Sequence, residues 1–138
     1  MTRVRRELPA GTVTFVFTDV AGSTRLLGEL GTEAYAEALA EHRRSVREVV
    51  ARHGGVEVDT QGDAFFLAFA SAASAVAAAG ELAAADGPVR VRVGVHTGVA
   101  LVTDEGYVGA DVHLAARVAA AANAGQVVLT DAVAPMPR

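Results

Sequence analysis

Two aspartates and a short turn of glycine and hydroxyl residues are the parts of this chain best suited to chemistry. Asp19 follows a segment, residues 12–18, in which apolar and polar side chains alternate, and Asp63 lies in a tight connection between two further segments. Just after Asp19, the turn Gly22-Ser23-Thr24 opens a helical stretch. Carboxylates bind hard divalent cations such as Mg²⁺, and the free N–H groups of a helix N-terminus bind phosphate. The pattern therefore indicates a two-metal nucleotide site.

Each of these residues also has an ordinary structural explanation. Asp19 could end a turn, Asp63 could belong to a simple hairpin, and Gly22 could be present only for its backbone freedom. Ser23 or Thr24 could serve only as the N-cap of the helix. The joint placement of two carboxylates beside this turn favours the metal site over the separate explanations.

Alternation and helical spacing predict the elements that position these residues. We expect strands at 12–18, 56–59, 64–69, 89–99 and 126–129, and helices at about 32–53, 71–85 and 111–122. The order of the first six main elements is strand, helix, strand, strand, helix, strand. This order predicts an α+β fold with a ferredoxin-like βαββαβ sheet and helices on one face.

The topology also predicts where the two aspartates meet. If strands 12–18 and 56–59 are parallel and joined by a right-handed crossover, the antiparallel strand 64–69 fits between them. The end of the first strand and the 56–69 hairpin connection then share one end of the sheet. Asp19 and Asp63 are therefore expected to lie together at that edge.

Composition narrows the classes of function. The chain has 138 residues, of which 51% are hydrophobic and 20% charged, enough to bury the core of one domain. Its net charge of −4 argues against binding to nucleic acid or to an anionic membrane. The absence of cysteine excludes disulfides and thiol chemistry. With no signal peptide and no membrane segment in this chain, we expect a cytoplasmic location.

Four motifs, taken together, resemble the catalytic domain of the class III adenylate/guanylate cyclases. They are FVFTDVAGST (15–24), GDAF (62–65), RVGVHTG (92–98) and AAR (115–117). The resemblance runs from residue 12 to about residue 130. We therefore expect a cyclase-type catalytic domain at 12–130 between an N-terminal tail, 1–11, and a C-terminal tail, 131–138.

The resemblance implies how the metal and phosphate would be held. Asp19 and Asp63 would bind two Mg²⁺ or Mn²⁺ ions per site, with the backbone carbonyl of Val20 as a further ligand. The backbone amides of Gly22, Ser23 and Thr24 would hold the β- and γ-phosphates of the nucleotide.

The resemblance also implies a homodimer with shared active sites. In the family, two domains pair head to tail, and each site combines the metal carboxylates of one subunit with a helix of the other. Arg117, on that helix, would reach the α-phosphate region. Strand 89–99 runs antiparallel to the first strand, so we expect it to deliver the Arg117 helix toward the end of the sheet away from Asp19. One subunit would then be unable to assemble the site alone.

Three positions depart from the family pattern. Four residues before Arg117, the family usually has an Asn that orients the ribose, and this chain has His113, whose imidazole can also donate a hydrogen bond. The family's adenine-reading Lys and Asp are replaced by Asp59 and Gly106. An acidic residue at the first of these positions resembles the guanylate-type members, so ATP and GTP both stay open. The chain is also short at its C-terminus, because family domains usually continue well beyond Thr130.

The predicted function is a purine nucleotide cyclase that converts ATP or GTP into a 3′,5′-cyclic nucleotide and pyrophosphate in intracellular signal transduction. Two metals suit the attack of the ribose 3′-oxygen on the α-phosphorus, since one can activate the hydroxyl and the other can offset charge on the leaving group. A catalytically weak or inactive cyclase-homology module, serving dimerisation or nucleotide sensing, is the alternative. A palm-type diguanylate cyclase is less favoured, because the 62–65 hairpin lacks a second acidic residue.

Overall fold

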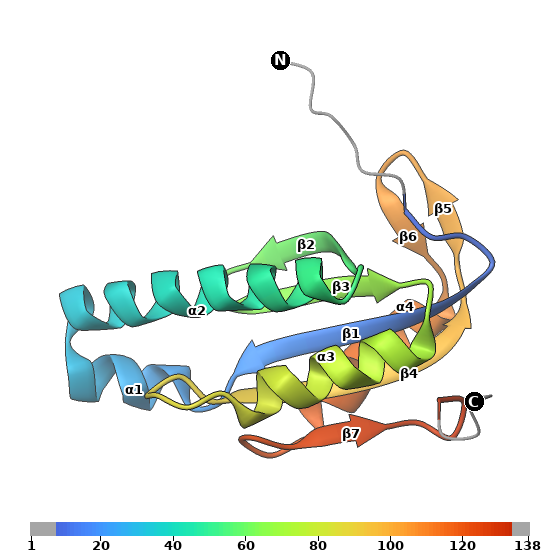
Figure 1. Cartoon of the computed structure of the whole chain (residues 1–138). Coiled ribbons are helices and arrows are strands. Elements are labelled where there is room, and N and C mark those ends of the chain that lie inside the picture. The colour runs from blue at the N-terminus through green and yellow to red at the C-terminus, as the bar shows by residue number, and fades with distance from the viewer. Residues whose placement is uncertain (1–7, 134–138) are drawn as a thin grey trace.

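The computed structural model describes residues 8–133, which form a five-stranded sheet, a small two-stranded hairpin and four helices (Figure 1). The large sheet contains β1 (Thr12–Val20), β2 (Val56–Gln61), β3 (Ala64–Phe69), β4 (Val91–Val99) and β7 (Val127–Leu129). The hairpin contains β5 (Leu101–Thr103) and β6 (Gly106–Val108). The helices are α1 (Ser23–Leu30), α2 (Thr32–Arg52), α3 (Ala72–Ala84) and α4 (Ala110–Ala120). Most of the two predicted tails lies outside the described residues.

The strand order of the large sheet is β2-β3-β1-β4-β7, with β1 at its centre. Because β1 and β2 are both antiparallel to β3, they are parallel to each other, and β3 lies between them. β4 is antiparallel to β1 on its other side, and β7 adds to β4 in parallel. The predicted ferredoxin-like arrangement is confirmed.

The larger hydrophobic core lies between one face of the sheet and helices α2 and α3, which stand in front of the sheet in Figure 1. Phe65, Leu67 and Phe69 point to this face from alternate positions of β3, as the two-residue period of a strand requires. Burial of these aromatic and aliphatic groups is the main stabilising contribution. The predicted helical layer on one face is therefore confirmed for α2 and α3.

The opposite face carries α4, a helix that follows the βαββαβ unit. Val112 and Ala115 of α4 pack with Val13 and Phe15 of β1 in a second core on this side. The β5–β6 hairpin follows β4 and turns the chain onto the second face before α4 begins. The extra helix thus lies outside the βαββαβ unit on which the expectation was based.

Gly94 of β4 allows the backbone of α4 to approach the sheet closely. A Cβ atom at this position would lie 2.3 Å from the backbone nitrogen of Ala119 and 2.6 Å from its Cα. Such distances are far below van der Waals contact, and the obstacle is a helix backbone that cannot rotate away. The small residues Gly94 and Ala119 therefore fix the distance between α4 and β4.

Replacing Gly94 by alanine should consequently destabilise the protein by about 1–3 kcal/mol, the usual cost of overpacking a core. Gly80→Ala is the matched control, because Gly80 lies on the exposed side of α3 with nothing within 4 Å of its Cβ position. Gly80→Ala should stabilise by about 0.5–1 kcal/mol through helix propensity. Urea unfolding followed by circular dichroism measures both. Equal stability of the two variants would contradict the close contact of α4.

A buried histidine fixes the start of α4. His96, which is 5% exposed, forms hydrogen bonds with Asp111 Oδ1 at 2.7 Å through Nε2 and with Thr130 Oγ1 at 2.8 Å through Nδ1. Asp111 Oδ2 also accepts from the backbone N–H of Val99 at 2.9 Å. The hydrogen bond with His96 is the main cause that lowers the pKa of Asp111. This network links β4, α4 and the end of β7.

Within residues 8–133, no helix is long and apolar enough to cross a bilayer.

Candidate active site

The two predicted metal ligands lie at the same end of the sheet. Asp19 is near the end of β1, and Asp63 lies in the turn between β2 and β3. Thr18 pairs with Phe65 across β1 and β3, so both aspartates are within two residues of that pair on adjacent strands. The predicted meeting of Asp19 and Asp63 at one edge is thus confirmed, while their role as metal ligands stays a prediction.

Arg92, on β4, is a residue of this edge that the sequence analysis did not assign. It lies opposite Asp19 in the β1–β4 register and forms a bidentate ion pair with it, with Nε to Oδ1 at 2.8 Å and Nη2 to Oδ2 at 2.6 Å. The hydrogen bonds that Arg92 donates to Asp19 are the main cause that raises the pKa of Arg92, and the charge of Asp63 contributes as well. The guanidinium of Arg92 therefore interacts electrostatically with both carboxylates.

The donor set at this edge suits a hard divalent cation. Two carboxylates and a backbone carbonyl are oxygen ligands, the type that Mg²⁺ prefers, and Mg²⁺ commonly completes its shell with substrate phosphates and water. Val20, the predicted carbonyl donor, is the last residue of β1 and follows Asp19 directly. The described residues contain no group of three or more histidine or acidic side chains placed to hold a metal.

The turn after β1 leads into a helix whose N-terminus has no side-chain cap. Gly22 is the N-cap of α1 and has the left-handed conformation, with φ 61° and ψ 40°, and no side chain caps this helix end. Ser23 is already the first helical residue, so the alternative in which Ser23 or Thr24 is the N-cap is wrong. The first amides of a helix have no acceptor inside it. Ala21 N–H donates to the Arg90 carbonyl at 2.8 Å, which ties the turn to the start of β4.

The structure corrects the predicted position of Arg117. α4 begins at the end of the sheet away from Asp19, but it runs back along β4, and the carbonyl of Ala120 at its end lies 3.5 Å from Nη1 of Arg92. Arg117 is thus near the Asp19 end and not at the opposite one. It is separated from Asp19 by its orientation, because Ala115 and Ala119 face the sheet while Arg117 is exposed.

His113 and Arg117 lie one turn apart on the exposed side of α4. Side chains four residues apart share a face of a helix, so both can act on the same ligand. That face points away from the sheet that carries Asp19 and Asp63.

Of the two predicted base-reading positions, Gly106 lies beside the strand that carries Asp59. A Cβ atom at Gly106 would have the side chain of Val58, the neighbour of Asp59, as its nearest contact at 3.9 Å. Asp59 is exposed and accepts hydrogen bonds from Thr60 N–H at 2.8 Å and from Gln61 Nε2 at 3.1 Å. The sequence analysis did not assign Gln61, although its position two residues after Asp59 on one strand was a usable signal.

A partly open aromatic surface lies on the α4 face of the sheet. Phe17 and Phe66 stack with ring centroids 4.3 Å apart, and both are only half-buried. They pack against the second core around Phe15 and Tyr107. Exposed apolar surface that gathers in one patch is typical of a protein interface.

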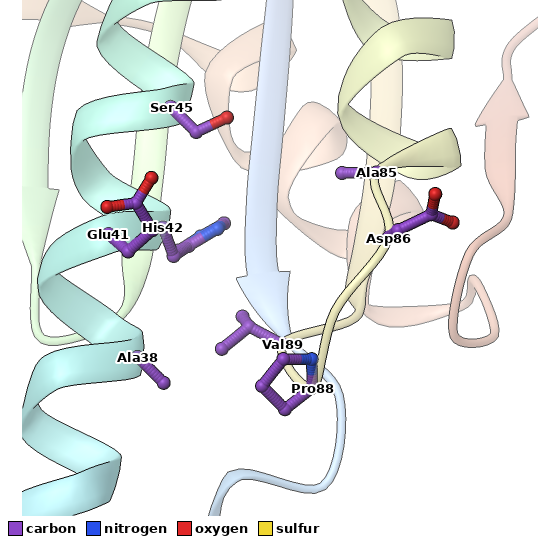
Figure 2. A pocket seen from close by; sticks show the side chains of 8 residues that line it. All are labelled: Ala38, Glu41, His42, Ser45, Ala85, Asp86, Pro88 and Val89. Atoms are coloured by element: carbon purple, nitrogen blue, oxygen red, sulfur yellow. The ribbon is translucent and has the colours of Figure 1, made fainter.

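A separate cavity of about 200 Å³ lies between α2 and the connection from α3 to β4 (Figure 2). Its lining consists of Ala38, Glu41, His42, Ser45, Ala85, Asp86, Pro88 and Val89, and includes none of the predicted site residues. The Nε2 atom of His42 is buried without a hydrogen-bond partner, and the ring meets Phe65 edge-on. Burial is the main cause that lowers the pKa of His42 below 6.5.

This pKa shift predicts a pH dependence of stability. Between the lowered folded-state pKa of His42 and the unfolded-state value of 6.5, the unfolded chain binds more protons than the folded protein. The free energy of unfolding should therefore fall as the pH drops through this interval. His42→Gln should remove that part of the pH dependence, whereas His113→Gln, at an exposed position, should leave it intact. Thermal unfolding at a series of pH values measures the difference, and identical profiles for wild type and His42→Gln would contradict the prediction.

The fold and the edge bearing Asp19 and Asp63 define an α+β domain of the nucleotide cyclase type. Residues 6–86, more than half of the chain, match the family model of the adenylate and guanylate cyclase catalytic domain. The chain belongs to this family, which favours the class III resemblance over the palm-type alternative.

Curated relatives match most of this chain. An uncharacterized protein of Mycobacterium tuberculosis is 40% identical over 132 residues, which cover 94% of this chain and 46% of the relative. Receptor-type adenylate cyclase B of Leishmania donovani is 33% identical over 170 residues, covering 87% of this chain and 13% of the relative. The chain therefore spans less than half the length of these curated relatives.

Solved structures share the fold. An adenylate cyclase of Trypanosoma brucei, solved in its monomeric state, matches with a TM-score of 0.83 and 28% identity, covering 93% of this chain and 77% of the other. The guanylate cyclase domain of RhGC from Catenaria anguillulae, solved in complex with GTP, matches with a TM-score of 0.74 and 21% identity, covering 88% of this chain and 79% of the other. The second likeness concerns the fold alone.

Proposed function

We propose that this chain is a purine nucleotide cyclase domain that converts ATP or GTP into a 3′,5′-cyclic nucleotide and pyrophosphate. The observation that carries the proposal is the position of Asp19 and Asp63 at one edge of the sheet, directly before the uncapped N-terminus of α1. Carboxylates for cations and free amides for phosphates are the two requirements of a metal–triphosphate complex. Membership of the cyclase family supplies the reaction class.

Each group of residues has a distinct task in the proposal. Two Mg²⁺ or Mn²⁺ ions, when bound by Asp19, Asp63 and the Val20 carbonyl, would lower the pKa of the ribose 3′-hydroxyl and offset the charge of the pyrophosphate. The amides of the turn from Gly22 to Thr24 bind the β- and γ-phosphates. The positive end of α1 favours these anions further.

The orientation of α4 supports a homodimer with shared sites. Arg117 and His113 point away from the sheet of their own subunit, so they are presented to a second molecule. Arg117 would stabilise the negative charge that builds at the α-phosphate of the partner's site, and His113 would orient the ribose. The half-buried pair Phe17 and Phe66 offers an apolar surface on the same side of the sheet for the contact.

The acidic residue Asp59 bears on the choice of base. A carboxylate accepts hydrogen bonds, and guanine presents N1–H and N2–H₂ donors on its Watson–Crick edge. Gln61 donates to one oxygen of this carboxylate and so helps to fix its direction. Adenine also offers a donor, its N6 amino group, so Asp59 is compatible with both GTP and ATP.

The test is incubation of the purified chain with ATP or GTP and Mn²⁺, followed by chromatography for 3′,5′-cyclic products. We expect a cyclic nucleotide from at least one of the two, and its identity shows which base is used. A folded dimer that forms neither product would contradict the cyclase activity. The departures at His113, Asp59 and Gly106 would then identify the chain as the inactive cyclase-homology module.

A further inference from the structure

Arg92 occupies the position from which a cation would contact Asp19. Its guanidinium donates to both carboxylate oxygens of Asp19, at 2.8 and 2.6 Å, and the charge of Asp63 also interacts with it. A bidentate guanidinium is the strongest hydrogen-bonding partner that a carboxylate finds among side chains. A divalent cation at Asp19 would therefore have a positively charged competitor already in place.

We propose that Arg92 is an exchangeable counter-ion, which holds Asp19 in the metal-free protein and must withdraw when a divalent cation binds. The inference rests on the proposed function, because it takes Asp19 as a metal ligand. In this role Arg92 is a positioning residue. Arg92 keeps the Asp19 carboxylate oriented and offsets its charge, so that this ligand is already in position before a cation binds.

The exposure of the ion pair supports an exchangeable contact. The side chains of Arg92 and Asp19 are 33% and 31% exposed, so water and ions can reach both. Ion pairs with this much solvent contact contribute little to stability. Two carboxylates facing one guanidinium also leave a net negative charge at the edge. The edge therefore still attracts cations when Arg92 is in place.

A second acceptor is available to Arg92 when it leaves Asp19. The carbonyl of Ala120, the last residue of α4, lies 3.5 Å from Nη1. The last carbonyls of a helix have no N–H donor within the helix, and the negative end of the helix dipole attracts cations. A small rotation of the side chain toward Ala120 would shorten this contact while it breaks the pair with Asp19.

The test measures binding of Mn²⁺ to the full chain without nucleotide, by the electron paramagnetic resonance signal of free Mn²⁺. Arg92→Gln should bind Mn²⁺ more tightly than wild type, on the order of tenfold, because a nearby competing charge is removed. Arg92→Lys, which keeps the charge but loses the bidentate geometry, should show a smaller gain. The double variant Arg92→Gln with Asp19→Asn should lose the gain entirely.

Arg90→Gln is the matched control. Arg90 is exposed directly before β4, and its guanidinium lies beside Gly125. Because this guanidinium does not pair with Asp19, Arg90→Gln should leave the Mn²⁺ affinity unchanged. Circular dichroism establishes that each variant is folded. Unchanged or weaker binding by both Arg92→Gln and Arg92→Lys overturns the inference, as does a gain of equal size in Arg90→Gln.

The outcome is separable from that of the proposed function. If the wild-type chain forms no cyclic nucleotide but Arg92→Gln binds Mn²⁺ more tightly through Asp19, the counter-ion role holds and the cyclase activity fails. If the chain is active and the affinity does not change, the inference alone fails. Absence of Mn²⁺ binding in every variant refutes the competition directly.

Discussion

Asp63→Asn should reduce the proposed cyclase turnover by at least about 100-fold while the protein keeps its fold, since it removes one of the two carboxylates proposed to hold the cations. The turn that carries Asp63 is held independently of this side chain, because the guanidinium of Arg43 on α2 donates to the carbonyl of Gly62. The neutral amide is close in size to the carboxylate. Initial rates with ATP and GTP, together with circular dichroism, measure the two parts of the expectation.

The control is Asp86→Asn, which removes a carboxylate from the exposed connection between α3 and β4. It changes the net charge by the same amount as Asp63→Asn and should leave turnover within about twofold of wild type, because a distant exposed charge is screened. Equal activity of Asp63→Asn and Asp86→Asn would show that Asp63 is not a metal ligand.

Mixing two inactive variants restores activity if the sites are shared between subunits. Arg117→Ala alone should lose about 2–4 kcal/mol of transition-state stabilisation, by analogy with the loss of one oxyanion donor. In a heterodimer of Arg117→Ala and Asp63→Asn, both lesions fall in one site and the other site is intact. Random exchange of equal amounts makes half of the dimers mixed, so about one quarter of wild-type activity should return.

A pair of variants on the same side of the site gives the control for complementation. In a heterodimer of Asp19→Asn and Asp63→Asn, each site keeps one lesion, so mixing should restore nothing. Subunit exchange is followed with two affinity tags that are recovered together. If the Arg117→Ala and Asp63→Asn mixture stays inactive although tagged heterodimers form, each subunit holds a complete site of its own.

The main sheet could be predicted because its strands carry clear periodicity. In the segment 64–69, Phe65, Leu67 and Phe69 alternate, and the predicted bounds equal those of β3. The prediction for β1 fell two residues short of its end, where Asp19 and Val20 continue the strand. Right-handed crossovers then left few topologies to consider, and this is why the meeting of Asp19 and Asp63 could be inferred.

The second face of the sheet could not be predicted in the same way. β5 and β6 have three residues each, which is too few for a strand period to show in the sequence. The side of the sheet that α4 covers depends on this hairpin. Without it, the direction in which Arg117 points could not be derived, and its expected position at the far end was wrong.

The ion pair between Arg92 and Asp19 could not be predicted from the sequence either. In β4, the valines on either side of Arg92 are buried in the larger core, and Arg92 lies on the other face of the strand. Its partner depends on the register between β1 and β4, which are joined by a long connection and not by a turn that fixes the register. Alternation alone gives the face of a strand residue but not its neighbour on the next strand.

The backbone contact between Gly94 and α4 determines which parts of the site can move. No side chain separates α4 from β4 at Gly94, so sliding the helix would drive backbone against backbone, and the two elements must move as one rigid body. α1 is the opposite case, because none of its residues is buried and little packing opposes its displacement. If the chain closes around a triphosphate as proposed, the motion should therefore be one of α1 and the turn at Gly22 against a fixed frame of sheet and α4.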